Sequence, residues 1–262
     1  KKTFPLSIQI QKISVMLILF WWILLVVSYV IYPLIMKLLA QNQLLNKYSF
    51  FEINDQLPSI NIVMSIHNEE KVLRQKLDSI FKSQYAIEKF HLIIGLDNCT
   101  DASLEIIKSY HQNYPQNIHF QSSERLGKPE MLNLLMRENR IASDVTIFTD
   151  ANVIFTENTL YELTKYFKDQ RVGLVDSKFV LSDQIISHDE EKDYLSFEQK
   201  LKYYEGLVWG TMQGPSGACY AIRTKLFQPI PDNFLVDDFF IGMNVMIQGF
   251  DSILNPMALV KE

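Results

Sequence analysis

The sequence predicts an α/β protein with a mostly parallel central sheet flanked by helices, preceded by an N-terminal transmembrane helix. Short apolar runs rich in β-branched residues alternate with segments whose apolar residues recur at helical spacing. Such alternation indicates strand–helix–strand units, which form parallel sheets. A long apolar segment near the N-terminus stands apart from this pattern and predicts the membrane helix.

The apolar segment covers residues 13–36, contains no charged residue and is bracketed by Lys12 and Lys37. A helix of this length extends over roughly 36 Å, which exceeds the hydrocarbon core of about 30 Å. A cleaved signal peptide has a shorter apolar stretch followed by small residues, and neither is present. We therefore expect a retained anchor over residues 1–42, with Pro33 as a possible kink. Lysines on both sides leave its orientation undetermined.

A polar linker is expected over residues 43–58, and a single large α/β domain over residues 59–262. Periodicity and helix-capping signals divide this domain into alternating elements. The predicted strands cover residues 60–66, 90–96, 117–121, 145–149, 173–181 and 219–222. The predicted helices cover residues 69–83, 102–110, 128–140, 158–167, 189–208 and 237–248.

Charge and cysteine content exclude some classes of function. Beyond residue 42 the chain has 21 basic and 30 acidic residues, a net charge of −9. A broad basic face for nucleic acid is therefore not expected. Cys99 and Cys219 are too few for a disulfide framework, and we expect reduced thiols in a cytoplasmic domain.

Acidic residues follow the predicted strands. Asp97 and Asp150 each close an apolar run, Asn152 comes two residues later, and Asp237-Asp238 opens a predicted helix. Open α/β sheets bind ligands at the carboxyl ends of their strands. Mg²⁺ and Mn²⁺ prefer carboxylate and carbonyl oxygens, completed by substrate phosphates. The pattern predicts an enzyme with a metal-bound, phosphate-bearing substrate, and Asp150 and Asn152 as metal ligands.

Other polar residues at these strand ends allow two interpretations. Asn68 fits a helix N-cap and Glu69 suits the helix dipole, although this turn can also line a nucleotide pocket. Arg125 and Lys128 precede a helix and suit phosphate, although such a turn is also common on surfaces.

The later motifs are equally open to two interpretations. Asp237 and Asp238 sit where helix caps sit, but their mutual repulsion should raise one pKa toward a value useful for a base. The segment Gly214-Pro-Ser-Gly217 is an ordinary turn signal, and it also lets backbone approach a sugar closely.

Taken in order, these motifs resemble the family 2 glycosyltransferases, which have a GT-A fold. The resemblance extends from about residue 60 to residue 262 and is strongest to the membrane-bound group with the poly-N-acetylglucosamine, hyaluronan and cellulose synthases. The motifs are Ser65-Ile-His-Asn-Glu69, Leu96-Asp-Asn-Cys-Thr-Asp101, Arg125-Leu-Gly-Lys128, Thr149-Asp-Ala-Asn152, Gly217-Ala-Cys-Tyr-Ala-Ile-Arg223 and Asp237-Asp238.

The resemblance implies a role for each motif. The nucleoside would be bound by the turns that carry Ser65, His67, Glu69 and Asp97, and the diphosphate would be bound by Arg125 and Lys128. Asp150 would bridge ribose and metal, Gly217 would face the acceptor, and Asp238, paired with Asp237, would be the catalytic base.

Two departures from the family pattern stand out. Asn152 stands where the family has an acid, so the expected dependence on Mg²⁺ or Mn²⁺ is weakened. The sequence ends at Glu262, before the place where processive members carry Gln-x-x-Arg-Trp and further membrane helices, so a truncated enzyme is expected.

The resulting expectation is a membrane-anchored, inverting glycosyltransferase. It would move a sugar from a nucleotide-diphospho-sugar, with UDP-sugar preferred, to a polysaccharide or lipid-linked acceptor. Its location would be a bacterial inner membrane, with the catalytic domain in the cytoplasm. The alternatives are a nucleotidyltransferase on a related sheet and a non-catalytic subunit of a synthase that binds nucleotide-sugar.

Overall fold

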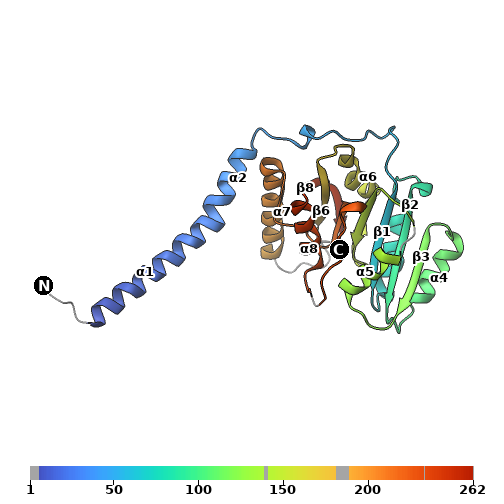
Figure 1. Ribbon diagram of the computed structural model, residues 1–262, viewed down its shortest axis with the longest axis horizontal. Helices are drawn as coiled ribbons and strands as arrows, with labels where there is room; N and C mark the ends of the chain where they lie inside the picture. The colour runs from blue at the N-terminus through green and yellow to red at the C-terminus, as the bar shows by residue number, and fades with distance from the viewer. Residues whose placement is uncertain (1–5, 139–140, 181–188, 233, 262) are drawn as a thin grey trace.

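The computed structural model describes residues 6–138, 141–180, 189–232 and 234–261. These residues form an eight-stranded sheet with the strand order β3-β2-β1-β4-β7-β6-β8-β5. The strands are β1 (Ile60–Ile66), β2 (Phe90–Asp97), β3 (Ile118–Ser123), β4 (Val145–Thr149), β5 (Ile154–Phe155), β6 (Val172–Val180), β7 (Cys219–Arg223) and β8 (Asp251–Lys261). Helices flank the sheet, as predicted, and Figure 1 shows the arrangement.

Within the domain, the α-helices are α3 (Glu70–Phe81), α4 (Ser103–Asn113), α5 (Lys128–Glu138), α6 (Thr159–Thr164), α7 (Asp189–Trp209) and α8 (Asp237–Ile247). Short 3₁₀ turns lie at Leu45–Lys47, Ile87–Lys89, Lys165–Lys168 and Thr224–Leu226. Each predicted strand and helix has a counterpart here. Some predicted positions lie outside the described residues. They are the end of the helix predicted over 128–140, the end of the strand predicted over 173–181, the first five residues of the anchor, and Glu262.

The sheet is parallel in one half and mixed in the other. β1 runs parallel to both β2 and β4, and β2 runs parallel to β3. β7 enters antiparallel between β4 and β6, while β8 is parallel to β6 and antiparallel to β5. The carboxyl ends of β1, β2 and β4 therefore lie at one edge of the sheet, where ligand-binding loops are expected.

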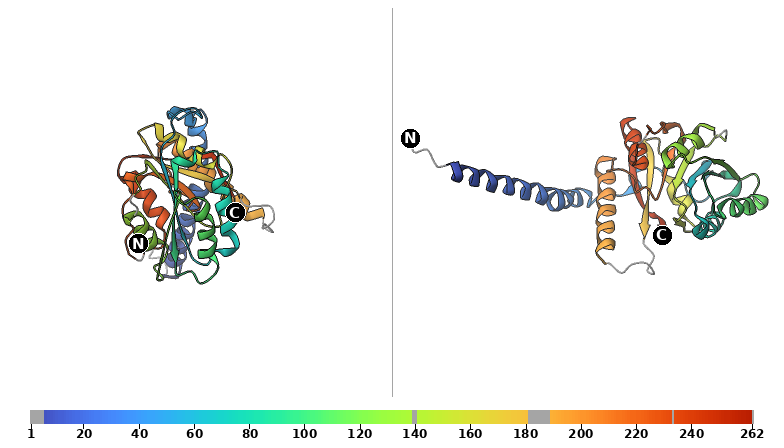
Figure 2. Two further views of the ribbon diagram at one scale, coloured as in Figure 1. Left: turned by 90° about the vertical axis from the view of Figure 1, so that its right-hand side faces the viewer. Right: turned by 90° about the horizontal axis from the view of Figure 1, so that it is seen from below.

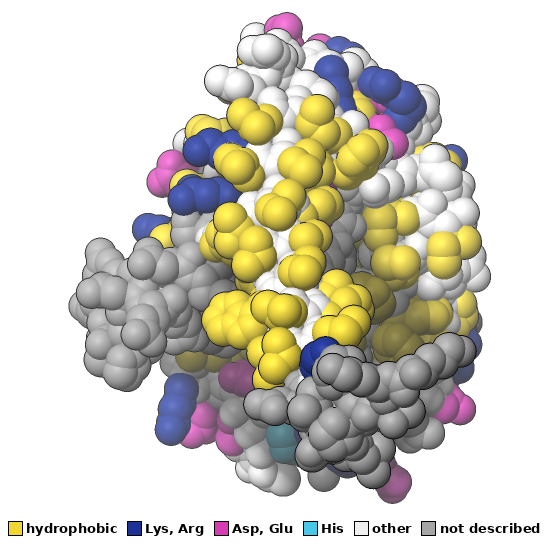
Figure 3. Space-filling view, turned by 90° about the vertical axis from the view of Figure 1, so that its left-hand side faces the viewer, with side chains coloured by type: hydrophobic (Ala, Val, Ile, Leu, Met, Phe, Trp, Pro, Cys, Tyr) yellow, Lys and Arg dark blue, Asp and Glu magenta, His cyan; other side chains and the backbone are white. Residues whose placement is uncertain are grey.

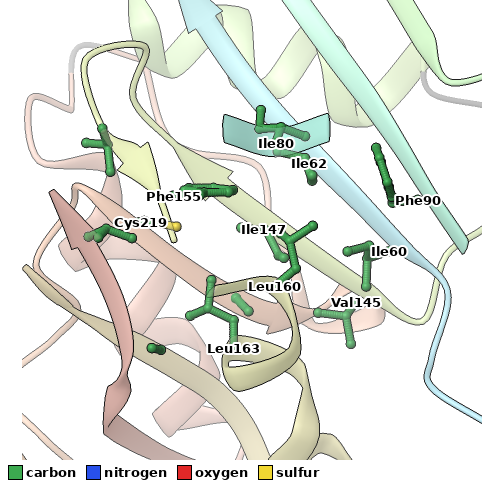
Figure 4. Close-up of a cluster of buried hydrophobic side chains, with 14 of the residues drawn as sticks. Ile60, Ile62, Ile80, Phe90, Val145, Ile147, Phe155, Leu160, Leu163 and Cys219 are labelled. Carbon is green, nitrogen blue, oxygen red and sulfur yellow. The ribbon is translucent and has the colours of Figure 1, made fainter. Parts of the chain in front are cut away.

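Both faces of the sheet are covered, which explains why the central strands β1, β2 and β4 are buried along almost their whole length. Helices α3, α4 and α6 pack on one face through residues such as Leu73, Ile106 and Leu160. Figure 4 shows part of this core around Ile62 and Ile147. Helices α5 and α8 cover the opposite face.

The turn after β1 differs from the prediction that Asn68 caps the next helix. Asn68 has φ +58°, and its Oδ1 accepts the N–H of Thr100 at 2.8 Å. The N–H groups of Glu69 and Glu70 donate instead to Ser103 Oγ and Asp101 Oδ2, both at 3.0 Å. The cap comes from the neighbouring loop because β1 and β2 are adjacent parallel strands whose loops emerge side by side.

The apolar N-terminal segment forms α1 (Leu6–Val26), a π-helical turn (Val27–Ile31) and α2 (Tyr32–Ala40). Residues Lys12–Ala40 form one helix long and apolar enough to cross a membrane. The helix extends away from the domain (Figures 1 and 2), and apolar side chains line it in Figure 3. A π turn over Val27–Ile31 interrupts the α-helix just before Pro33, which lies at the start of α2. A kink at Pro33 itself stays a prediction.

The end of the apolar helix and the following segment contact the domain. Tyr32 Oη donates to Glu205 of α7 at 2.7 Å, and Met36 is fully buried. Within the segment predicted as a linker, Tyr48 is buried and the N–H of Phe51 donates to the Lys165 carbonyl at 2.9 Å. Residues 43–58 therefore make specific contacts with the domain.

Candidate active site

A pocket of about 300 Å³ lies where β4, β7, α5 and α8 meet. Six residues predicted from the sequence line it, although they come from four separate segments of the chain. These residues are Lys128, Asp150, Asn152, Gly217, Asp237 and Asp238. The pocket is therefore the candidate catalytic centre.

Lys128 connects the acids of this pocket. Its Nζ lies 2.8 Å from Asp150 Oδ1 and 3.7 Å from Asp237 Oδ2. Burial lowers the pKa of Lys128, but Asp150, Asp237 and Asp238 together raise it above its ordinary value. The side chain therefore stays a cation at neutral pH and offers a fixed positive charge to a phosphate.

Asp237 and Asp238 differ in environment although they are adjacent. Asp237 is buried, and its pKa is raised by burial and by Asp238, while Lys128 opposes the rise. The prediction that one member of the pair has a raised pKa is confirmed for Asp237, with burial as the largest cause. Asp238 is half-buried, and its Oδ1 accepts the N–H of Phe239 at 2.8 Å.

Gly217 makes room for the Asp238 carboxylate. It has φ +76°, and a Cβ at this position would lie 2.6 Å from Asp238 Oδ2. A side chain here would therefore displace the carboxylate. The start of β7 is held against the end of β4, because the N–H of Asp150 donates to the Ala218 carbonyl at 3.1 Å.

Asp97 lies at the end of β2 and is bound by the protein itself. Its carboxylate accepts the N–H of Leu126 at 2.6 Å and of Gly127 at 2.9 Å, and Arg125 Nη1 lies 3.0 Å from Oδ2. His67 Nδ1 lies 2.6 Å from the Asp97 carbonyl oxygen. Asp97 thus anchors the loop that carries Lys128, a role that its position in the sequence did not predict.

Ser65 and Glu69 lie at the neighbouring end of β1. Ser65 is half-buried and pairs in register with Gly95. The pKa of Glu69 is raised by burial, with Asp101 and Asp150 adding to the effect and His67 opposing it. Glu69 does not line the pocket that contains Asp150.

The donor set in the pocket fits a hard divalent cation. Asp150 and Asn152 both line the pocket and supply a carboxylate and an amide oxygen. Within the described residues, no group of three His, Cys, Asp or Glu side chains is arranged to hold a metal ion. Two protein oxygens suit Mg²⁺ or Mn²⁺ when substrate phosphates complete the coordination.

The sequence did not predict the wall that α7 contributes. Glu198, Gln199 and Lys202 line the pocket, and Lys202 Nζ lies 2.8 Å from Glu198 Oε1. A charged pair four residues apart is the ordinary pattern of an exposed helix face, so no sequence signal distinguishes this one. Cys99 and Cys219 are free thiols, as expected.

A mixed α/β sheet with acids and a lysine gathered at its strand ends suits a transferase of the GT-A type. The chain belongs to glycosyl transferase family 2, because that family's model matches residues 61–230. The predictions of the family and of the fold class are confirmed.

Curated relatives agree with this assignment. The chain is 24% identical over 222 residues to the "Probable glycosyltransferase YdaM" of Bacillus subtilis (strain 168), covering 79% of this chain and 51% of that protein. It is 27% identical over 110 residues to the "Minor teichoic acid biosynthesis protein GgaA" of the same organism, covering 42% of this chain and 25% of the relative. The chain thus spans at most about half the length of these relatives.

Solved structures share the fold. The mannosyltransferase PcManGT from Pyrobaculum calidifontis, in complex with GDP-Man and Mn²⁺, has a TM-score of 0.74 at 21% identity, covering 92% of this chain and 67% of that chain. S. aureus TarS 1–349 in complex with UDP-GlcNAc has a TM-score of 0.58 at 15% identity, covering 78% of this chain and 58% of that chain. The narrower resemblance to membrane-bound synthases stays a prediction.

Proposed function

We propose that this chain is a membrane-anchored, inverting glycosyltransferase that uses a nucleotide-diphospho-sugar. The observation that carries the proposal is the meeting of Lys128, Asp150, Asp237 and Asp238 in one pocket. A cation beside several acids at strand ends suits a substrate that combines a diphosphate with a reacting sugar. We favour a UDP-sugar as donor, and TarS, solved with UDP-GlcNAc, supports that choice.

Asp238 is the proposed catalytic base. An acceptor hydroxyl oxygen attacks the anomeric carbon as the bond from that carbon to the diphosphate oxygen breaks, and Asp238 takes the hydroxyl proton. A single displacement inverts the anomeric configuration. Gly217 supports this role, because its missing side chain leaves Asp238 Oδ2 open toward the pocket. Asp237 is buried and lies beside Lys128, so it is less accessible to the acceptor than Asp238 is.

Lys128, together with the side-chain oxygens of Asp150 and Asn152, would stabilise the leaving group. Lys128 is a cation held at the start of α5, where the helix N-terminus also favours negative charge. Asp150 and Asn152 would hold a divalent cation, which when bound neutralises charge on the departing diphosphate. Mg²⁺ and Mn²⁺ both fit these oxygen ligands, and PcManGT, which was solved with Mn²⁺, supports metal dependence.

The nucleoside would lie along the ends of β1 and β2. Ser65 lies near the end of β1, His67 and Glu69 lie in the turn that follows it, and Asp97 with Arg125 forms the adjoining wall. In this arrangement the loop is held by the bonds from Leu126 and Gly127 to the Asp97 carboxylate. We expect Asp97 to contribute to nucleoside binding mainly by holding that loop.

The acceptor and the location are further parts of the proposal. The exposed apolar helix Lys12–Ala40 supports anchoring in a lipid bilayer, which we take to be a bacterial inner membrane with the domain in the cytoplasm. GgaA, a relative named for minor teichoic acid biosynthesis, supports a polysaccharide or lipid-linked acceptor. The acidic domain argues against nucleic acid as a partner.

The test uses the full chain and the variant Asp238→Asn. UDP- and GDP-sugars are first screened for thermal stabilisation with and without Mn²⁺, and donor turnover is then measured as nucleoside diphosphate release. We expect Asp238→Asn to abolish transfer while UDP affinity stays within about 3-fold of the unsubstituted protein.

The products distinguish the alternatives. Equal loss of turnover and UDP binding would refute Asp238 as the base. Release of pyrophosphate would indicate a nucleotidyltransferase. Donor binding without any turnover by the full chain would indicate a non-catalytic subunit.

A further inference from the structure

Lys76 is a fully buried cation on α3, behind the candidate active site. Its Nζ donates to Thr149 Oγ1 at 2.7 Å and to the Val153 carbonyl, and it lies 3.7 Å from the centre of the Phe155 ring. Among the described residues, no carboxylate forms an ion pair with it. A buried ammonium held by two neutral oxygens and an aromatic face is unusual, because burial of a charge is costly without a counter-charge.

The two hydrogen bonds of Lys76 do not depend on its charge. Burial lowers the pKa of this amine to about 7, and Cys219 and Asp150 oppose the shift. An ammonium carries three N–H groups and a neutral amine two, so both forms satisfy the two acceptors. These two hydrogen bonds therefore persist across neutral pH.

The two acceptors flank the turn that carries Asp150 and Asn152. Thr149 directly precedes Asp150, and Val153 directly follows Asn152. The Thr149 hydroxyl in turn approaches the Ala218 carbonyl at 3.3 Å, next to Gly217. Lys76 thus connects α3, both ends of the turn and the start of β7.

We propose that Lys76 is a positioning residue for the sugar donor's diphosphate and its metal ion, because it fixes both ends of residues 149–153 so that Asp150 and Asn152 face the pocket. This inference rests on the proposed function. A functional site requires its ligands within about 0.5 Å of the productive geometry, which a supporting shell must supply. The need is greater here because Asn152 offers a neutral oxygen, which binds a cation less strongly than a carboxylate does.

The test compares Lys76→Met with the full unsubstituted chain. We expect the Mn²⁺ concentration for half-maximal activity, and the Mn²⁺ dissociation constant measured with UDP by calorimetry, to rise by roughly 10–100-fold. UDP affinity without metal should change by less than about 3-fold, because the turns proposed to bind the nucleoside follow other strands than the turn that Lys76 holds.

Ser79→Ala is the matched control. Ser79 lies on the same helix, and its Oγ accepts the N–H of Phe155 at 3.2 Å, so it also joins α3 to β5 but does not hold the turn. We expect it to lower thermal stability without changing the Mn²⁺ dependence. If Lys76→Met does not fold, Thr149→Val removes one of the two hydrogen bonds of Lys76 with little change of volume and should raise the Mn²⁺ requirement by a smaller factor.

The outcomes separate the two proposals. An unsubstituted chain that binds neither UDP-sugar nor Mn²⁺ would refute the proposed function itself. A chain that binds both, with Lys76→Met or Thr149→Val showing unchanged Mn²⁺ dependence, would refute only the role of Lys76. The same shift in Ser79→Ala would also overturn it, because the effect would then be general destabilisation.

Discussion

Replacing Gly217 with alanine should disable the proposed base while leaving the fold almost intact. The added Cβ would lie 2.6 Å from Asp238 Oδ2, whereas ordinary contact begins at 3.4 Å. The carboxylate must therefore move by about 0.8 Å. A displacement of about 1 Å of a catalytic group costs roughly 10²-fold in rate. We expect kcat for donor turnover to fall by about that factor.

The effect of Gly217→Ala on stability should be smaller. Gly217 has φ +76°, a conformation that costs an alanine about 1–2 kcal/mol. A carboxylate at the end of a short side chain can rotate away, so the steric contact itself adds little. The expected decrease in the free energy of unfolding is about 1 kcal/mol, because alanine also reduces the entropy of the unfolded chain.

Gly249→Ala is the control that isolates the steric contact. Gly249 has φ +83°, and a Cβ added there would meet no atom within 4 Å. This variant should lose the same stability and keep its activity. Thermal unfolding and nucleoside diphosphate release are measured for both variants at saturating donor. Equal activity in the two variants would refute the argument that Gly217 leaves room for Asp238.

Two further predictions concern charge. Asp176 is fully buried beside Ser216, and burial, opposed by Lys202, raises its pKa to about 7, so the folded state binds its proton more tightly than the unfolded state. The contribution of Asp176 to the free energy of unfolding is therefore present below about pH 4 and is lost as the pH rises toward 7, by about 4 kcal/mol at about 1.4 kcal/mol per pH unit. Asp176→Asn should reduce this dependence of the unfolding free energy on pH, measured by denaturant unfolding, and an unchanged pH dependence would contradict the assignment. Asn152→Asp should lower the Mn²⁺ concentration for half-maximal activity, and an unchanged titration would remove residue 152 from the ligand set.

The fold was largely predictable because its central strands are buried on both faces and helices such as α3 carry one apolar stripe. β8 was not predicted, because Asn255 and Pro256 interrupt its apolar run and so remove the pattern expected of a strand. The proline is tolerated because the pairing with β6 shifts there, from Asp176 opposite Leu254 to Lys178 opposite Leu259. β5 has only two residues, too few for any periodic signal.

The candidate pocket was predictable because strand ends converge, but its supporting contacts were not. The partners of Asp97 lie 29 and 30 residues away in a loop, so nothing in the local sequence indicates them. Lys76 carried a signal that is easily overlooked. It falls on the apolar face of its helix between Leu73 and Leu77, a position that an exposed lysine would not occupy.

The contact between α2 and α7 bears on how this enzyme should be purified. Met36 and Ala40 are buried, and Tyr32 supplies a hydrogen bond to Glu205, whose other oxygen accepts the N–H of Gln213 at 3.1 Å. If the N-terminal helix is the membrane anchor that we propose, deleting it to avoid detergent would uncover the α7 surface near Trp209, which is already 60% exposed. A detergent-free preparation would then aggregate through that face, unless the cut left residues 32–40 in place.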